Sequence, residues 1–126
     1  MRKYLVVTNN PLCARGVSQA HELSFYEGAD LLGVLIAVRA KIHEGHTLVT
    51  HPLTSSLKPN ETPYKTVLLR FQQESLCYES LDLIESAIRV YETFARNSRH
   101  VTWSDLPPNV LDDLALIDYD MIKEAI

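Results

Sequence analysis

The 126-residue sequence has few of the features that mark specialised protein classes. Its two cysteines, Cys13 and Cys77, lie 64 residues apart, which argues against a disulfide framework or a cysteine-based zinc site. Its longest apolar run, residues 31–38, contains Gly33 and is far shorter than the roughly 20 residues of a membrane span. The first residues hold too few apolar side chains for a signal peptide. The length predicts one domain over residues 1–126, and the lack of a signal-peptide or membrane-span pattern leads us to expect a cytoplasmic protein.

Positive charge is also in short supply, with 12 Lys and Arg against 16 Asp and Glu and a net charge of -4. This balance argues against nucleic acid as a partner, because phosphate binding needs clustered Lys and Arg. The charge is unevenly distributed: residues 1–73 carry 8 basic and 5 acidic side chains, whereas residues 74–126 carry 4 and 11. An anionic ligand is therefore expected to bind the first part of the chain.

Glycine is rare, with 4 residues in all and none after Gly45. Neither of the familiar glycine-rich phosphate-binding loops is present, so the usual nucleotide cradle is unsupported. The remaining composition, 46% apolar and 22% charged, is that of an ordinary globular protein.

The sequence does contain a regular succession of short apolar runs and amphipathic stretches. The apolar runs predict strands over residues 4–8, 21–26, 46–51 and 64–71. The amphipathic stretches predict helices over residues 11–18, 30–43, 79–96 and 107–126. Because strands and helices alternate in the first half, the predicted fold class is α/β, with a mostly parallel, three-to-four-stranded, Rossmann-like sheet flanked by helices.

Two of these helices carry clear local signals. Asn10, directly ahead of Pro11, is the expected N-cap of the first one. In the helix over residues 30–43, apolar side chains recur at helical spacing and predict the buried face Leu31, Val34, Leu35, Val38 and Ile42, which Leu32 and Ile36 are expected to widen.

Polar segments follow two of the predicted strands, where ligands bind in open α/β sheets. Thr8-Asn9-Asn10-Pro11 follows the first strand, and residues 51–64 follow the strand that begins near Thr47. If these strands are parallel neighbours, the two segments share one edge of the sheet. The longer segment holds three of the six prolines and no glycine, a stiffness that suits a preorganised polar pocket. The alternative is a structural excursion that packs through Leu53 and Leu57.

This placement defines a set of candidate ligand-binding residues. They are Thr8, Asn9, Asn10, His51, Ser55, Ser56, Lys58, Asn60, Thr62, Tyr64 and Lys65. The lysines would supply positive charge, the asparagines hydrogen bonds and His51 a switchable donor. The predicted ligand is small and polar or anionic, and the sequence identifies no cofactor.

Two other chemistries receive less support. His43, His46 and His51 lie within nine residues, but roughly 15 Å of extended chain separates the last two, so the three cannot ligate one ion and no metal site is predicted. Cys13 could have a lowered thiol pKa in the first turn of a helix, but small-residue packing is the favoured interpretation.

Several stretches together resemble one known family. They are Thr8-Asn9-Asn10-Pro11, Val38-Arg39, residues 42–46, residues 50–53, the unbroken run 58–65, Trp103-Ser104 and residues 116–120. They are similar to the GrdX family, small proteins encoded beside the glycine, sarcosine and betaine reductase genes of amino-acid-fermenting anaerobes. The resemblance implies a cytoplasmic accessory of a selenium-dependent reductase system, and it implies no reaction, cofactor or catalytic residue. The chain departs from the family pattern at Ala40, where an acidic residue is more usual.

Three hypotheses about function follow. The first is an accessory protein that binds a small ligand between the Asn9-Asn10 turn and the segment from His51 to Lys65. The second is a small enzyme with His51 as general base and Glu61 or Lys58 as its partner. The third is a module that docks a reductase component through its acidic second half, which includes Glu79, Glu85 and Glu92. None of the three needs a nucleic acid or a membrane as partner.

Overall fold

The computed structural model describes residues 3–17, 20–53, 62–97 and 106–126. The elements in chain order are β1 (Tyr4–Thr8), α1 (Pro11–Gly16), β2 (Glu22–Phe25), α2 (Leu31–His43), β3 (Thr66–Arg70), α3 (Tyr78–Asn97) and α4 (Pro108–Ala125). Each of them was predicted from the sequence, with ends that agree within two residues. Over these described ranges, no helix combines the length and the apolarity needed to cross a membrane.

The three strands form a mixed sheet in the order β2-β1-β3. β1 and β2 are parallel, whereas β1 and β3 are antiparallel, with Thr8 opposite Thr66. The α/β class is therefore confirmed, but the expected mostly parallel, Rossmann-like sheet is not, because one of the two strand pairs runs the other way.

The strand predicted over residues 46–51 is reduced to an isolated bridge between Leu48 and Leu69. The backbone N–H of Val49 donates to Leu68 O at 2.9 Å, but the N–H of Leu68 donates to the Thr50 side chain at 3.0 Å. A hydroxyl thus occupies the position of a strand carbonyl, and a regular ladder does not continue. The bridge lies on the far side of β3 from β1, so the condition stated for a shared edge, two parallel neighbouring strands, is not met.

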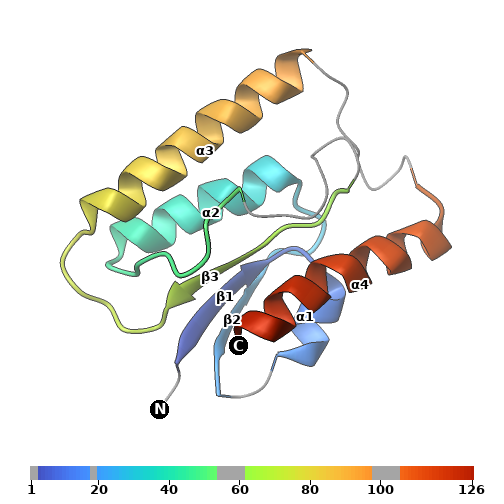
Figure 1. Ribbon diagram of the computed structural model, residues 1–126, viewed down its shortest axis with the longest axis horizontal. Coiled ribbons are helices and arrows are strands. Elements are labelled where there is room, and N and C mark those ends of the chain that lie inside the picture. Colours follow the sequence, from blue (N-terminus) through green and yellow to red (C-terminus); the bar gives the residue numbers. More distant parts are fainter. Residues whose placement is uncertain (1–2, 18–19, 54–61, 98–105) are drawn as a thin grey trace.

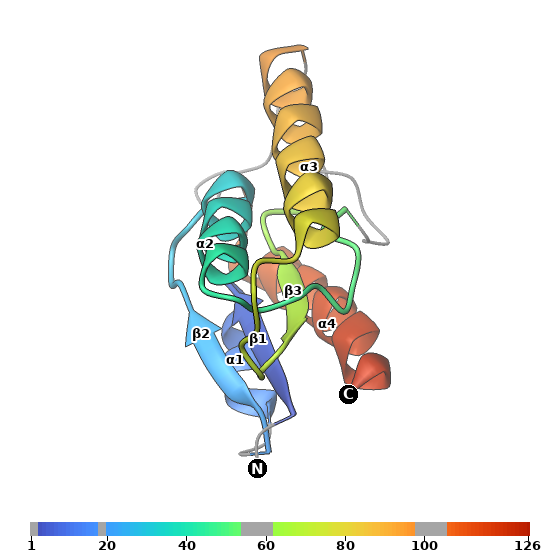
Figure 2. The same cartoon turned by 90° about the vertical axis from the view of Figure 1, so that its left-hand side faces the viewer.

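Helices cover both faces of the sheet, with α2 and α3 on one side and α1 and α4 on the other (Figures 1 and 2). The main core lies on the α2 side and contains Leu5, Val7, Leu31, Val34, Leu35, Val38, Ile42, Val67, Leu69, Ile84, Ile88 and Tyr91. It includes all five predicted core residues of α2. Ile36, however, is 43% exposed, so the expectation that it widens the buried face was wrong.

Both ends of helix α2 are defined by local interactions, a side-chain cap at the start and a glycine turn after the end. The Asp30 side chain caps its start by accepting a hydrogen bond from Gly33 N at 2.7 Å. After its end, Gly45 has a φ of 108°, and a Cβ at that position would collide with the backbone of Glu74. The close approach of residue 74 therefore requires glycine where the chain leaves α2.

The core on the opposite side of the sheet is small. Val6, Leu68 and Ile122 are its buried members, and Val17 and Leu23 pack against it. Polar side chains occupy the neighbouring positions of this face, at the end of β1 and the start of β3.

Candidate functional site

The structure brings the end of β1 and the described residues 62–65, which precede β3, to one edge of the sheet. Because β3 is antiparallel to β1, the start of β3 meets the end of β1, and Asn9 N donates to Lys65 O at 3.3 Å. We call this region the polar edge and define it as Thr8, Asn9, Asn10, Lys65, Thr66 and Asp118. Four of these six residues were candidates from the sequence, whereas Thr66 and Asp118 were not.

Asn9 is fully buried and joins three parts of the chain. Its Nδ2 donates to Ala29 O and to Pro63 O, both at 2.8 Å, and its Oδ1 accepts from Lys65 N at 2.9 Å. Both amide hydrogens are therefore used within the protein. The side chain holds the end of β1 to the start of α2 and to the segment ahead of β3.

Asn10 is also fully buried and connects α1 to α4. Its Oδ1 accepts from Leu12 N at 3.0 Å, which confirms the predicted N-cap. Its Nδ2 donates to Ala115 O at 2.8 Å and to Asp118 Oδ2 at 2.9 Å. Like Asn9, Asn10 thus uses its amide within the protein.

A chain of hydrogen bonds runs from Asn10 to the carboxylate of Asp118. The Thr66 hydroxyl donates to Asp118 Oδ2 at 2.6 Å, which uses its single hydrogen. In the 2.7 Å contact between the two threonine hydroxyls, Thr8 must therefore be the donor. Thr8 Oγ1 in turn accepts from Asn10 N at 2.9 Å. Every donor in the chain points toward Asp118, an arrangement in which each hydrogen bond polarises the next.

The Cys13 thiol joins the same network. Its Sγ lies 3.7 Å from Asp118 Oδ2 and 3.4 Å from Thr66 Oγ1. Burial, and then the nearby charge of Asp118, raise the pKa of Cys13 to about 12. The thiol therefore stays protonated at neutral pH, and the packing interpretation fits Cys13 better than a reactive thiolate.

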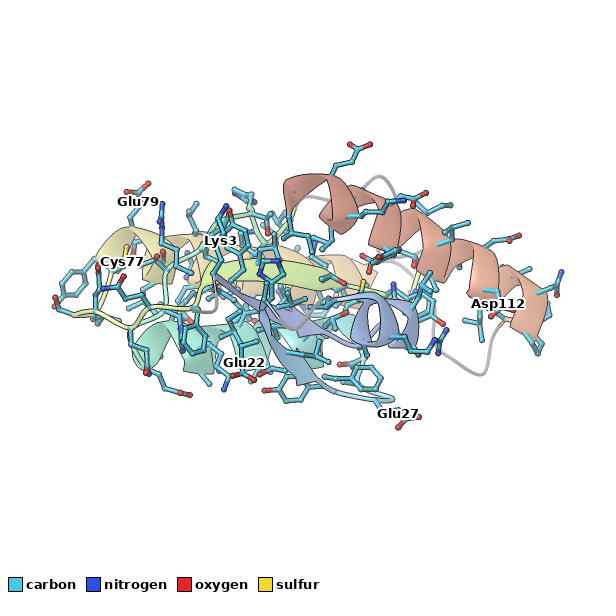
Figure 3. All side chains as sticks on the ribbon, turned by 90° about the horizontal axis from the view of Figure 1, so that it is seen from below. Lys3, Glu22, Glu27, Cys77, Glu79 and Asp112 are labelled. Atoms are coloured by element: carbon cyan, nitrogen blue, oxygen red, sulfur yellow. The ribbon has the colours of Figure 1, made fainter. Side chains whose placement is uncertain are left out.

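The second cysteine lies in a different environment. Hydrogen bonds from Ser80 lower the pKa of Cys77, which is only partly buried. Figure 3 shows Cys77 and Glu79 at the opposite end of the molecule from Asp112, which lies on the first turns of α4. Cys77 is thus remote from the polar edge.

Lys65 and Tyr64 are buried beside this network. Lys65 is only 8% exposed, and burial lowers its pKa to about 8 although the charge of Asp118 acts in the opposite direction. Burial, and then the charges of Asp112 and Asp118, raise the pKa of Tyr64. The backbone N–H of Tyr64 donates to the buried Thr62 hydroxyl at 3.2 Å.

A small pocket opens next to Asp118. It has a volume of about 40 Å³ and is lined by Thr50, Thr66, Asp118, Met121 and Ile122. Asp118 Oδ2 receives the three donors described above, and Oδ1 accepts no hydrogen bond from the described parts of the chain. The arrangement offers a hydrogen-bond acceptor to whatever enters the pocket.

The remaining candidates from the sequence are not among the six residues that define the polar edge. His51 is exposed, and its Nδ1 accepts from Leu53 N at 3.1 Å. Leu53, the expected packing anchor of the alternative interpretation, is 41% exposed. The other candidates, Ser55, Ser56, Lys58, Asn60 and Glu61, lie outside the described residues, as does Leu57.

The three clustered histidines have separate surroundings. His46 is buried, and its Nδ1 lies 2.9 Å from Arg70 O, whereas His43 and His51 are exposed. Among the residues that the structure describes, no group of three or more His, Cys, Asp or Glu side chains could hold a metal ion.

Sequence reasoning missed Asp118, although a signal for it exists. On α4, Ala115 and Ile122 are buried, and Asp118 lies on the same helical face, three residues after the first and four before the second. An acidic residue within an apolar helical stripe is uncommon and indicates a partner in the folded protein. Thr66 gave no such signal, because threonine is ordinary in a strand.

Fold and site together define a small α/β protein with an open mixed sheet and a carboxylate held by a buried polar network at one edge. Comparison with known proteins then gives its family. The chain belongs to the GrdX-like protein family, whose family model matches residues 5–126 and confirms the resemblance seen in the sequence. No curated protein and no solved structure shows a significant match.

Proposed function

We propose that this protein is an accessory of a glycine, sarcosine or betaine reductase system that binds a small polar or anionic ligand at the polar edge. Membership of the GrdX-like family supports the first part of the proposal. The buried charge at the polar edge supports the second part.

The burial of Lys65 is the observation that supports ligand binding most directly. A side chain of this type is rarely buried, because removing its charge from water costs free energy. Lys65 nevertheless lies 8% exposed in the segment that Asn9 holds against β1. We take the asparagines as the frame of the site and Lys65, together with Lys58 and His51 from the sequence, as the groups that contact the ligand.

Ligand titrations followed by NMR amide shifts test this proposal, with acetate, glycine, sarcosine and betaine as probes. We expect Lys65→Met to weaken acetate binding by about tenfold, because it removes a charge-assisted hydrogen bond. Lys123→Met, which removes an exposed lysine of α4, is the matched control and should bind as the parent does. Lys58→Ala should weaken binding while the Tm stays within a few degrees. Unchanged binding in both Lys65→Met and Lys58→Ala would refute the site.

The alternative of a small enzyme with His51 as base has less support. A general base works in a cleft that excludes water, and His51 is exposed, with Nδ1 already accepting from Leu53 N. The geometry therefore favours binding over catalysis at this residue.

Docking of a reductase component through the acidic second half remains a second candidate. Helix α3 exposes Glu79 and Glu92 together with Val90, which is 54% exposed, whereas Glu85 forms an ion pair with Arg39 at 3.2 Å. Binding of purified reductase components to Glu79→Lys and Glu92→Lys tests it, with Asp113→Lys on α4 as the control. Docking through α3 predicts that only the first two variants lose binding.

A further inference from the structure

The pocket beside Asp118 lies between the start of β3 and the second half of α4, which run side by side (Figures 1 and 2). Its volume of about 40 Å³ exceeds the roughly 10 to 15 Å³ that one water molecule needs by this measure. It is too small for a whole metabolite. The space therefore suits one end group of a ligand whose remainder stays outside.

The charge of the lining is negative. Among the described residues that line the pocket, Asp118 is the one with a charge. Lys65 interacts with the Asp118 charge but does not line the pocket. From the described residues, a group that enters would therefore meet the Asp118 carboxylate and no cation, which favours a positively charged group over an anion.

The hydrogen bonds of the lining determine which atoms remain for a ligand. Thr66 gives its hydrogen to Asp118 Oδ2, so its hydroxyl cannot donate into the pocket. Thr50 Oγ1 already accepts from Leu68 N, and its hydroxyl keeps a second lone pair and one hydrogen. With Oδ1 of Asp118 also available, the described lining offers more acceptors than donors, which favours a ligand that donates hydrogen bonds.

The position of the carboxylate is set before any ligand arrives. Three donors, from Asn10, Cys13 and Thr66, contact the same oxygen, Oδ2. A side chain held in this way loses little further conformational entropy on binding. The described lining also includes the apolar side chains of Met121 and Ile122, which suit the carbon atoms next to a charged nitrogen.

We propose that this pocket binds the primary ammonium end of a small organic amine, with one N–H donating to Asp118 Oδ1 and another to Thr50 Oγ1. The inference deepens the proposed function, because it names the class of group that the polar edge receives beside Lys65. It predicts discrimination by shape: a methylammonium ion fits and donates, whereas tetramethylammonium has no N–H and is larger.

The direct test uses methylammonium chloride as the probe and the amide shifts of the pocket residues as the readout, at constant ionic strength. We expect saturable shifts with a Kd on the order of 10 mM, as befits two non-hydrogen atoms. Asp118→Asn should raise this Kd about tenfold or more, because it removes the charged acceptor. Asp120→Asn makes the same charge change on an exposed position of α4 and should leave the Kd unchanged.

A second variant keeps the test valid if Asp118→Asn disturbs α4. Met121→Phe fills the pocket and leaves the hydrogen bonds to Asp118 Oδ2 in place. Loss of methylammonium binding in this folded variant supports the proposal. Equal Kd values for methylammonium, tetramethylammonium and potassium would overturn it, as would an unchanged Kd in both Asp118→Asn and Met121→Phe.

The outcome can be separated from that of the proposed function. Acetate binding that depends on Lys65, without methylammonium binding, refutes the ammonium pocket alone. Methylammonium binding that depends on Asp118, without acetate binding, refutes the anion site at Lys65 alone.

Discussion

The two faces of the sheet are built by different kinds of interaction. Toward α2 and α3, the strands present Leu5, Val7, Val67 and Leu69, and one large apolar cluster joins them to both helices. Toward α1 and α4, alternate positions of the same strands present valine and leucine beside Thr8 and Thr66. The first face is held by apolar burial, whereas the second depends largely on hydrogen bonds to Asp118.

This difference separates stability from positioning. Apolar burial is non-directional and contributes most of the free energy of folding. A buried hydrogen bond contributes only about 1 kcal/mol net, but its geometry is specific. The α2 side therefore stabilises the sheet, and the α4 side holds one carboxylate oxygen next to a pocket.

The largest effect is expected on the apolar face. Leu69→Ala should lower the free energy of unfolding by about 4 kcal/mol, because it removes a fully buried side chain and leaves a cavity. Urea denaturation measures this change. Leu116→Ala on α4, where the side chain is 50% exposed, is the control and should change the value by less than about 0.5 kcal/mol. Similar losses in both variants would contradict the assignment of the main core.

The next effect depends on pH and concerns the buried charge at the polar edge. The pKa of Lys65 is lowered from 10.5 to about 8 in the folded protein, so between these pH values the unfolded chain binds more protons. The free energy of unfolding of the parent should therefore rise with pH in this window, relative to Lys65→Met, by up to about 3 kcal/mol.

Both proteins in that comparison retain Cys13, so the contribution of its raised pKa cancels in the difference. Below pH 8 the lysine is protonated in both states, and the difference between parent and variant should be constant. Chemical denaturation from pH 7 to 10.5 measures it. Parallel curves across the whole range would show that Lys65 is not buried as described.

A smaller effect is expected from the frame of the polar edge. Asn10→Ala should cost about 2 kcal/mol, because it removes the N-cap of α1 and the hydrogen bonds from the Asn10 amide to Ala115 O and Asp118 Oδ2. Asn109→Ala, at an exposed position in the first turn of α4, is the matched control. Thermal or urea unfolding that gives equal values for the two variants would refute the role of Asn10.

The smallest effect is expected from the charges on the outer surface of α2 and α3. The ion pair of Arg39 and Glu85 joins side chains that are 37% and 39% exposed, so water and salt screen it. Glu85→Gln should lower the free energy of unfolding by about 0.5 kcal/mol or less, as measured by urea denaturation at low salt. A loss above 1 kcal/mol would contradict the comparison, because it would mean that polar interactions also stabilise the α2 and α3 side of the sheet substantially.

Local patterns predicted much of the fold. Helix α2 and its five buried positions followed from 3.6-residue spacing, and Asn10 followed from the sequence of an N-cap ahead of proline. The strand expected over residues 46–51 did not form as a ladder, because Leu68 N bonds to the Thr50 hydroxyl. No local pattern shows which of two acceptors an N–H will select.

The candidate site was predicted only in part, because local patterns do not show which partners the polar side chains select. Thr8, Asn9 and Asn10 could be placed at a strand end from the sequence, and the structure joins them to Lys65. The use of the two asparagine amides within the protein, and the convergence of the network on Asp118, depend on contacts between residues 20 to 108 positions apart. Such contacts leave only a weak trace in the sequence, here an acid in an apolar helical stripe.

The sequence by itself determined the α/β class, the helix ends and faces, and the family, because each of these depends on spacing or on unbroken runs of residues. The tertiary structure alone decided that β3 runs antiparallel to β1 and that α4 packs against β3. Strand direction is set by how the whole chain packs over the sheet, not by any one segment. That packing places the half-buried Asp118 and the buried Lys65 at the same edge, where the proposed ligand would bind.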